Sequence, residues 1–136
     1  FRERIGEIPG RVRRPPRPRM LVAVDSSGSI GSEVLARVSR EVRALGALAR
    51  VTVVECDAVV HRVYRPQGLI GPVVGGGDTD FGPVFGYAQR SRFDGIVYFT
   101  DGRGLEPDRS PLPTLWVVTH DGPWAAPFGR VTRLYD

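Results

Sequence analysis

Apolar residues in this chain gather in short runs that are separated by polar, glycine-rich turns. Four of the runs are almost continuously apolar, which is typical of strands buried on both faces of a sheet. They span residues 20–24, 51–56, 95–100 and 114–119. Residues 59–65 alternate between apolar and polar side chains and predict a half-exposed edge strand after a tight turn. Residues 130–134 predict a last, short strand.

Two further segments carry the periodicity of helices. In the first, apolar side chains recur every three or four positions, at Ile30, Val34, Val38, Val42 and Leu45. This spacing places them on one face of an amphipathic helix, which we expect to begin near Ser32. Phe81, Phe85 and Ala88 mark a shorter helix, and Pro83 fits its first turn. The alternation predicts an α/β fold, with a mostly parallel sheet, one antiparallel edge strand and helices on both faces.

Residues 1–19 differ from the rest of the chain in composition. They hold four prolines, seven arginines and two acidic residues, with too few apolar side chains for a core. The remaining residues carry twelve arginines and thirteen acids, so the pI near 10 arises from the first nineteen residues. We therefore predict a basic arm or interdomain linker over residues 1–19 and a globular domain over residues 20–136. Because the chain starts at Phe1, we also expect an upstream domain of the same parent chain.

The cysteine content and the length of the apolar runs indicate the cellular compartment. Cys56 is the one cysteine, which excludes an internal disulfide framework and a cysteine-rich zinc site. No apolar run approaches the roughly 18 residues of a membrane span. These features predict a cytoplasmic protein with no membrane contact.

Three polar clusters lie where predicted strands end or a helix begins. Residues 25–29 read Asp-Ser-Ser-Gly-Ser after the first strand, and residues 100–102 read Thr-Asp-Gly after the strand at 95–100. Residues 75–80 read Gly-Gly-Gly-Asp-Thr-Asp before the shorter helix. In open α/β sheets, ligands bind outside the carboxyl ends of parallel strands. The first and third clusters are therefore expected to converge.

The oxygen atoms of these clusters suit a hard divalent cation. Asp25 and Asp101 supply carboxylates, and the serines and threonines supply hydroxyls. The alternation of Asp25, Ser27 and Ser29 lets a tight turn direct three oxygens to one point, where Gly28 permits the backbone to bend. Such ligands favour Mg²⁺, Mn²⁺ or Ca²⁺ over zinc.

This arrangement resembles the metal-ion-dependent adhesion site of von Willebrand factor A domains. The resemblance rests on D-x-S-x-S after a buried strand, a threonine in a later glycine-rich loop, and T-D-G after another strand. It covers about residues 20–135 and implies a compact, Rossmann-like von Willebrand A fold. It also implies five metal ligands, two of which, Ser27 and Ser29, bind Mg²⁺ directly. The full set is Asp25, Ser27, Ser29, Thr79 and Asp101.

Four stretches, ECDAVVHRVYRP, GGGDTDFGPVF, YFTDGRG and LWVV, are similar to a bacterial subfamily of these domains. That subfamily forms the C-terminal part of proteins with a metallopeptidase-like N-terminal region. The resemblance implies a protein-binding module in which the metal captures an Asp or Glu of a partner protein. It points to a MoxR-type AAA+ ATPase, or a substrate presented to one, as the partner. Asp78 departs from the subfamily pattern, which usually has a neutral residue there, and an acid beside Thr79 would strengthen cation binding or compete with an acidic ligand.

Two other functions remain open at this point. A Mg²⁺-dependent phosphoryl-transfer hydrolase would use Asp25 as nucleophile, but such enzymes usually place a second aspartate two residues on, where this chain has Ser27. The arginine-rich arm would bind nucleic acid through its charge, but it lacks interleaved aromatic residues beyond Phe1. The chain has no H-E-x-x-H motif, P-loop or Cys–His pair, so we do not expect this domain to be an enzyme.

Simpler structural roles compete for the same residues. Asp25 is also suited to capping the following helix. Asp57 is expected to be a turn residue, and Asp78 and Asp80 are expected to be solvated loop residues rather than direct ligands. His61 has no partner at metal-ligand spacing, and Trp124 is expected at the surface near the end of the sheet.

Overall fold

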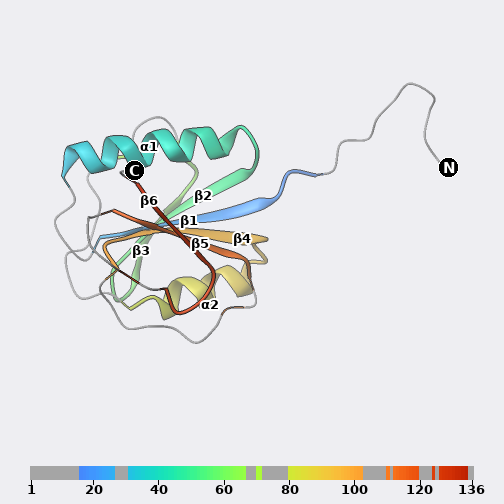
Figure 1. The fold of residues 1–136 in the computed structure, drawn as a ribbon. Coiled ribbons are helices and arrows are strands. Elements are labelled where there is room, and N and C mark those ends of the chain that lie inside the picture. The colour runs from blue at the N-terminus through green and yellow to red at the C-terminus, as the bar shows by residue number, and fades with distance from the viewer. Residues whose placement is uncertain are drawn as a thin grey trace, which may run out of the picture.

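A single six-stranded sheet organises the protein (Figure 1). The computed structural model describes residues 16–26, 31–66, 70–71, 80–102, 110, 112–119, 124 and 126–134. The strand order is β3-β2-β1-β4-β5-β6, and every neighbouring pair is parallel except β2 with β3. The strands are β1 (Arg19–Asp25), β2 (Arg50–Cys56), β3 (Val60–Tyr64), β4 (Gly95–Thr100), β5 (Thr114–Val118) and β6 (Arg130–Arg133).

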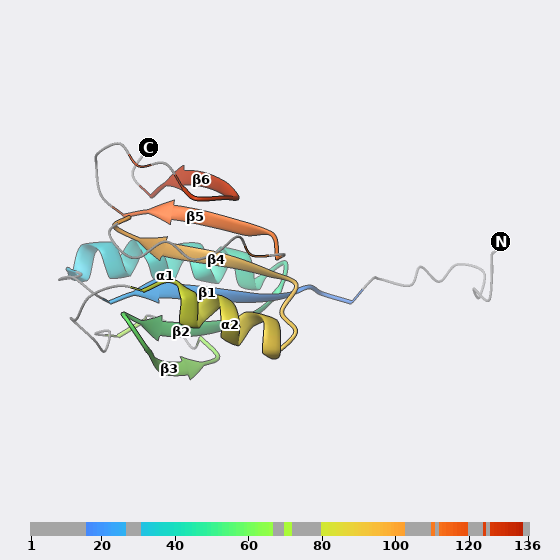
Figure 2. The same ribbon diagram turned by 90° about the horizontal axis from the view of Figure 1, so that it is seen from below.

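Two helices cover opposite faces of this sheet (Figure 2). They are α1 (Ser32–Gly46) and α2 (Gly82–Arg90). The predicted α/β class, the antiparallel edge strand and helices on both faces are confirmed, and Pro83 lies in the first turn of α2. Strand β1 begins one residue earlier than the apolar run, because Arg19 still pairs with Arg50. Most of the predicted loop at 66–80 lies outside the described residues.

The chain connections explain why the helices lie on opposite faces. The crossover through α1 runs from β1 outward to β2, whereas the connection from β2 to its parallel strand β4, through β3 and α2, runs back to the other side of β1. Right-handed crossovers in opposite directions must use opposite faces of the sheet. As a result, β1 and β4 lie side by side, and the chain leaves them in opposite directions. This switch point is where open α/β sheets bind ligands.

The sheet separates two apolar layers because alternate strand residues point to opposite faces. The α2 layer is rich in aromatic rings, with Trp116 completely buried and stacked on Tyr98 at a centroid distance of 5.1 Å. Phe81 meets both rings edge-on. The α1 layer is mainly aliphatic and includes Val22, Val24, Val38, Val42, Val53, Val97 and Phe99. In the described residues, neither helix is long and apolar enough to cross a membrane.

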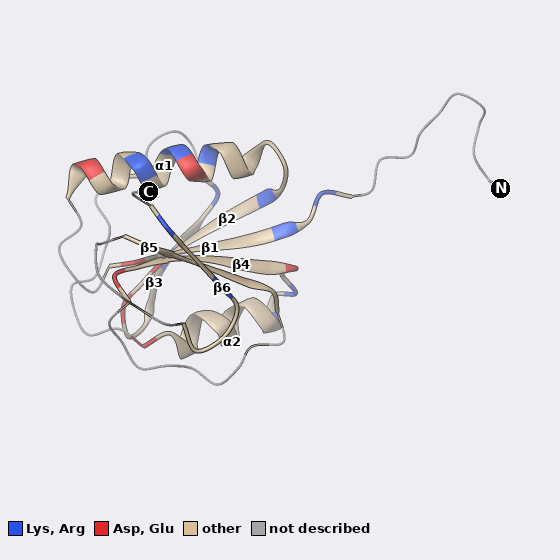
Figure 3. Cartoon of the chain, in the orientation of Figure 1, with Lys and Arg blue, Asp and Glu red and all other residues tan. Residues whose placement is uncertain are grey.

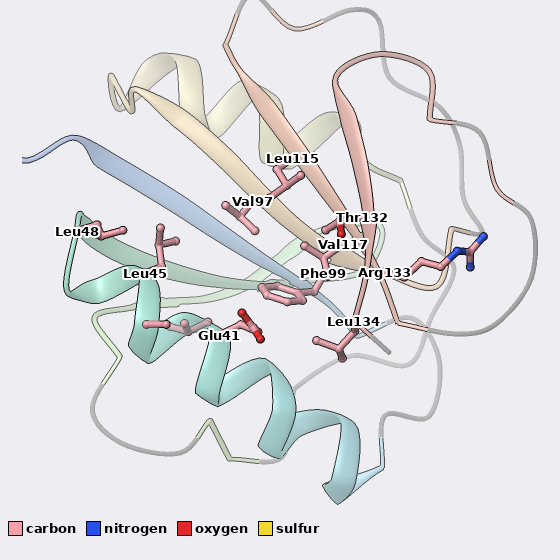
Figure 4. A pocket seen from close by; sticks show the side chains of 12 residues that line it. Glu41, Leu45, Leu48, Val97, Phe99, Leu115, Val117, Thr132, Arg133 and Leu134 are labelled. Atoms are coloured by element: carbon pink, nitrogen blue, oxygen red, sulfur yellow. The ribbon is translucent and has the colours of Figure 1, made fainter. Parts of the chain in front are cut away.

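An apolar groove of about 450 Å³ lies on the α1 face, between this helix and the half of the sheet formed by β4, β5 and β6 (Figure 4). Leu45, Val97, Val117 and Leu134 contribute to its lining. Its walls come from the face of the sheet rather than from the strand ends that carry the polar clusters.

A buried carboxylate fastens the antiparallel edge strand. Glu55 is 0% exposed within the otherwise apolar run of β2. Arg62 donates from Nε and Nη2 to Oε1 at 3.0 and 2.8 Å, and from Nη2 to Oε2 at 3.0 Å. The hydroxyl of Tyr64 donates to Oε2 at 2.5 Å. Burial and this hydrogen bond raise the pKa of Tyr64, so its hydroxyl keeps the proton that it donates.

We expect Tyr64→Phe to lower the free energy of unfolding by about 1–2 kcal/mol, because a buried charged acceptor loses a donor. Tyr87→Phe is the matched control, since the Tyr87 hydroxyl has no hydrogen-bond partner among the described residues, and it should change stability by less than about 0.5 kcal/mol. Urea unfolding of the three proteins measures both effects. Equal stability of the two variants would contradict this role of Tyr64.

Candidate functional site

The carboxyl ends of β1 and β4 bring two of the polar clusters together. Asp25 ends β1 and is 4% exposed, and Thr100 ends β4 and is 1% exposed. The pairing of Val24 with Phe99 brings the two residues to the same level of the sheet. The Thr100 hydroxyl donates to Oδ2 of Asp25 at 2.7 Å and accepts the amide of Gly102 at 3.0 Å. One buried hydroxyl therefore connects Asp25 to the Thr-Asp-Gly turn that carries Asp101.

The same turn is held from its other side by an aromatic ring. Gly102 has φ +87°, a conformation that favours glycine. A Cβ at this position would lie 2.9 Å from the indole ring of Trp124. Trp124 is half-buried and meets Trp116 edge-on at 5.3 Å. The turn after β4 is thus packed against the aromatic layer of the core. Trp124 lies near the end of the sheet, as predicted, but it is half-buried against this layer rather than at the surface.

The end of β2 supports the segment after β1. Both the amide and the hydroxyl of Ser26 donate to the carbonyl of Cys56, at 2.7 and 2.8 Å. The Cys56 thiol lies 3.3 Å from the Tyr98 hydroxyl. Burial raises the pKa of Cys56 to about 12, although the hydrogen bond with Tyr98 partly opposes this shift. Because a thiolate is the form that binds metals and attacks electrophiles, Cys56 is unsuited to either task.

Two further aspartates at this end have structural partners. Oδ1 of Asp57 accepts the amide of Val59 at 3.1 Å and lies 2.8 Å from Nε2 of His61. The Asp57 carbonyl accepts the amide of Asp80 at 3.3 Å, and Asp80 in turn accepts the amide of Gly82 at the start of α2. Asp57 is a turn residue, as predicted, and its contacts tie the residue that follows Thr79 to the end of β2. The pairing of His61 was missed, because nothing in its sequence spacing indicates that a turn brings Asp57 to it.

Of the five predicted ligands, the structure describes Asp25 and Asp101, and both lie at the same end of the sheet. Ser27, Ser29 and Thr79 lie outside the described residues, as does Asp78. The alternative in which Asp25 caps a helix is not supported. Helix α1 begins at Ser32, its N-cap residue is Gly31, and no side-chain hydrogen bond from the described residues caps it.

The donor chemistry at this end fits a hard cation. Within the described residues, no group of three or more His, Cys, Asp or Glu side chains is placed to hold a metal. A cation here would need hydroxyl or water oxygens beside Asp25 and Asp101, and Mg²⁺ accepts such a set. The protonated Cys56 adds no soft ligand that would favour zinc.

Comparison with known proteins agrees with the observed fold. The family described as VWA-like domain (DUF2201) matches residues 20–135. The chain belongs to this family. An uncharacterized protein of Thermotoga maritima is 34% identical over 93 residues, which are 62% of this chain and 23% of that relative. The VWA-like chain thus spans about a quarter of the length of the curated relative that it matches. No solved structure matches it.

We expect Thr100→Val to lower the free energy of unfolding by about 1–3 kcal/mol, because Oδ2 of Asp25 and the amide of Gly102 would both lose a buried partner. Thr100→Ser keeps the hydroxyl and should retain most of the stability. Thr114→Val is a matched control, since Thr114 is equally a strand threonine but makes one bond, to the Leu112 carbonyl at 3.0 Å. Urea unfolding measures these stabilities. If Thr100→Val is as stable as Thr114→Val, or more stable, the linking role of Thr100 is contradicted.

Proposed function

We propose that this VWA-like domain is a protein-binding module that depends on a divalent cation, in which Mg²⁺ or a similar ion captures an Asp or Glu of a partner protein. The observation that carries the proposal is the bond between Thr100 and Asp25, which joins two of the three polar clusters at the switch point of the sheet. In the proposed site Asp25, Ser27, Ser29, Thr79 and Asp101 surround the cation, directly or through water.

The expected charge balance favours a carboxylate from outside the chain. Serine and threonine hydroxyls are neutral, so they leave the charge of a divalent cation largely in place. A cation with few directly bound carboxylates remains electrophilic and gains a favourable bond from an incoming Asp or Glu. Asp78 would weaken this capture if its carboxylate reached the same cation.

Binding is better supported than phosphoryl transfer. The position two residues after Asp25 is Ser27, which is a poor general acid. In addition, Asp25 is 4% exposed and one of its oxygens accepts a hydrogen bond from Thr100, which suits a held ligand better than an approachable nucleophile.

We further propose that the domain works inside a longer protein. The much greater length of the Thermotoga maritima relative supports this view. By resemblance, the other parts would include a metallopeptidase-like region, and the partner would be a MoxR-type AAA+ ATPase or its substrate. The arm at residues 1–19 would contact a neighbouring domain rather than the metal site. The separation from the metal site is supported by Arg17, which donates to the Gly46 carbonyl, and by Arg19, which donates to the Ser91 carbonyl, both at the opposite end of the sheet.

The direct test is a calorimetric titration with Mg²⁺ and Mn²⁺. We expect one cation to bind per chain, and Asp25→Asn and Asp101→Asn to weaken binding at least about tenfold. Glu41→Gln, an exposed acid on α1, is the control for the loss of one negative charge and should bind as the wild type does. Equal affinity of all four proteins, or no binding by the wild type, would refute the metal site.

The proposal also predicts that the fold survives removal of the cation. The apolar layers are complete without a metal, so EDTA should leave the circular dichroism spectrum unchanged. Unfolding on chelation would identify the metal as structural and would contradict a capture role.

A further inference from the structure

Basic residues gather where β1 and β2 begin, whereas helix α1 carries both basic and acidic residues (Figure 3). The end opposite the candidate site is where β1 and β2 begin and where both helices terminate. We call this end the basic pole. It is formed by six exposed arginines, Arg17, Arg19, Arg43, Arg50, Arg90 and Arg92. The described carboxylate at this end is Asp94, and it accepts the backbone amide of Arg19.

Printed contacts and strand register bring these arginines together. Arg19 and Arg50 are paired across β1 and β2, and the amide of Arg50 bonds to the Pro18 carbonyl at 2.8 Å. The guanidinium of Arg19 reaches the carbonyls of Ser91 and Arg92 at 2.8 and 3.4 Å. Among the described residues, no ion pair to a carboxylate neutralises any of the six.

Helix ends account for only part of this cluster. Arg17 and Arg19 bind carbonyls at the ends of α1 and α2, and Arg43 and Arg90 lie in the last turns, where positive charge opposes the helix dipole. Arg50 begins a strand, and Arg92 follows the end of α2. These two guanidinium groups have no structural partner among the described residues.

The backbone conformation of Arg92 is unusual in a way that does not depend on the charge of the cluster. Arg92 has φ +58° and is the one non-glycine residue with positive φ in the described part of the chain. Its amide bonds to the Gln89 carbonyl, and the amide of Phe93 bonds to the Ala88 carbonyl. This is a Schellman helix end, at which glycine is the preferred residue. An arginine in this conformation is strained, and its guanidinium is the group that a glycine would not supply.

We infer that the basic pole is a docking surface for an acidic protein segment. Exposed guanidinium groups bind carboxylates in a bidentate manner, and several of them on one surface recognise a run of Asp or Glu. Single-stranded nucleic acid is less suited, because base stacking needs open aromatic rings. Of the described rings at the pole, Phe93 is 4% exposed and its neighbour Tyr87 is half-buried. The arm enters the domain here and adds further arginines in sequence, which extends the same charge preference.

The test uses the full chain, a fluorescent polyglutamate peptide and, separately, a single-stranded DNA oligonucleotide, all in EDTA at physiological ionic strength. Chelation removes any contribution of the candidate cation, so the result is independent of the proposed function. We expect Arg92→Gly to weaken peptide binding about two- to fivefold, as the loss of one exposed ion pair implies. We also expect it to raise the thermal midpoint by a few degrees, because it relieves the strained backbone.

Charge reversal gives the matched comparison. Arg50→Glu should weaken peptide binding more than Arg40→Glu, which alters the net charge equally but lies on α1 outside the pole. Unchanged peptide affinity in Arg92→Gly, or equal losses in Arg50→Glu and Arg40→Glu, would overturn the inference. Tighter binding of the single-stranded DNA than of the peptide would overturn the assignment of an acidic protein segment.

Discussion

The hydrogen bond from Thr100 to Asp25 connects the two strands on which the carboxyl end of the sheet depends. It is possible because opposed right-handed crossovers leave β1 and β4 adjacent, and because both residues end their strands at the same level. The same hydroxyl accepts the Gly102 amide, and Trp124 closes over that glycine. Sheet topology, one hydroxyl and the aromatic layer therefore fix the positions of Asp25 and the turn that carries Asp101.

The two ends of the sheet differ in chemistry because the strands are mostly parallel. At the carboxyl end, backbone turns and buried side chains hold carboxylates in place, as the contacts of Asp57 and Asp80 illustrate. At the other end, arginines stand exposed around the ends of both helices. A parallel sheet keeps these ends apart by the full length of its strands. A protein with one partner at each end could thus bind both without competition between them.

Much of the fold could be predicted because its strands are continuous apolar runs and its first helix has a regular apolar face. The convergence of Asp25 with the turn of Asp101 also followed from parallel strands alone. Glu55 was missed because one acid inside an apolar run gives no sign that Arg62 and Tyr64 will reach it from the next strand. The strain at Arg92 depends on where α2 ends, which the sequence pattern locates only approximately. Ser27, Ser29 and Thr79 remain predictions, because they lie outside the described residues.

The central claim is that the carboxyl end of β1 and β4 holds a divalent cation. Paramagnetic broadening by Mn²⁺ in an amide NMR spectrum of the labelled protein tests it most directly, because the effect depends on distance from the ion. Substoichiometric Mn²⁺ should broaden the amides of Asp25, Ser26, Asp101 and Gly102, while those of Arg50 and Arg92 at the basic pole stay sharp. Broadening centred elsewhere, or spread evenly over the exposed acids, would contradict the account.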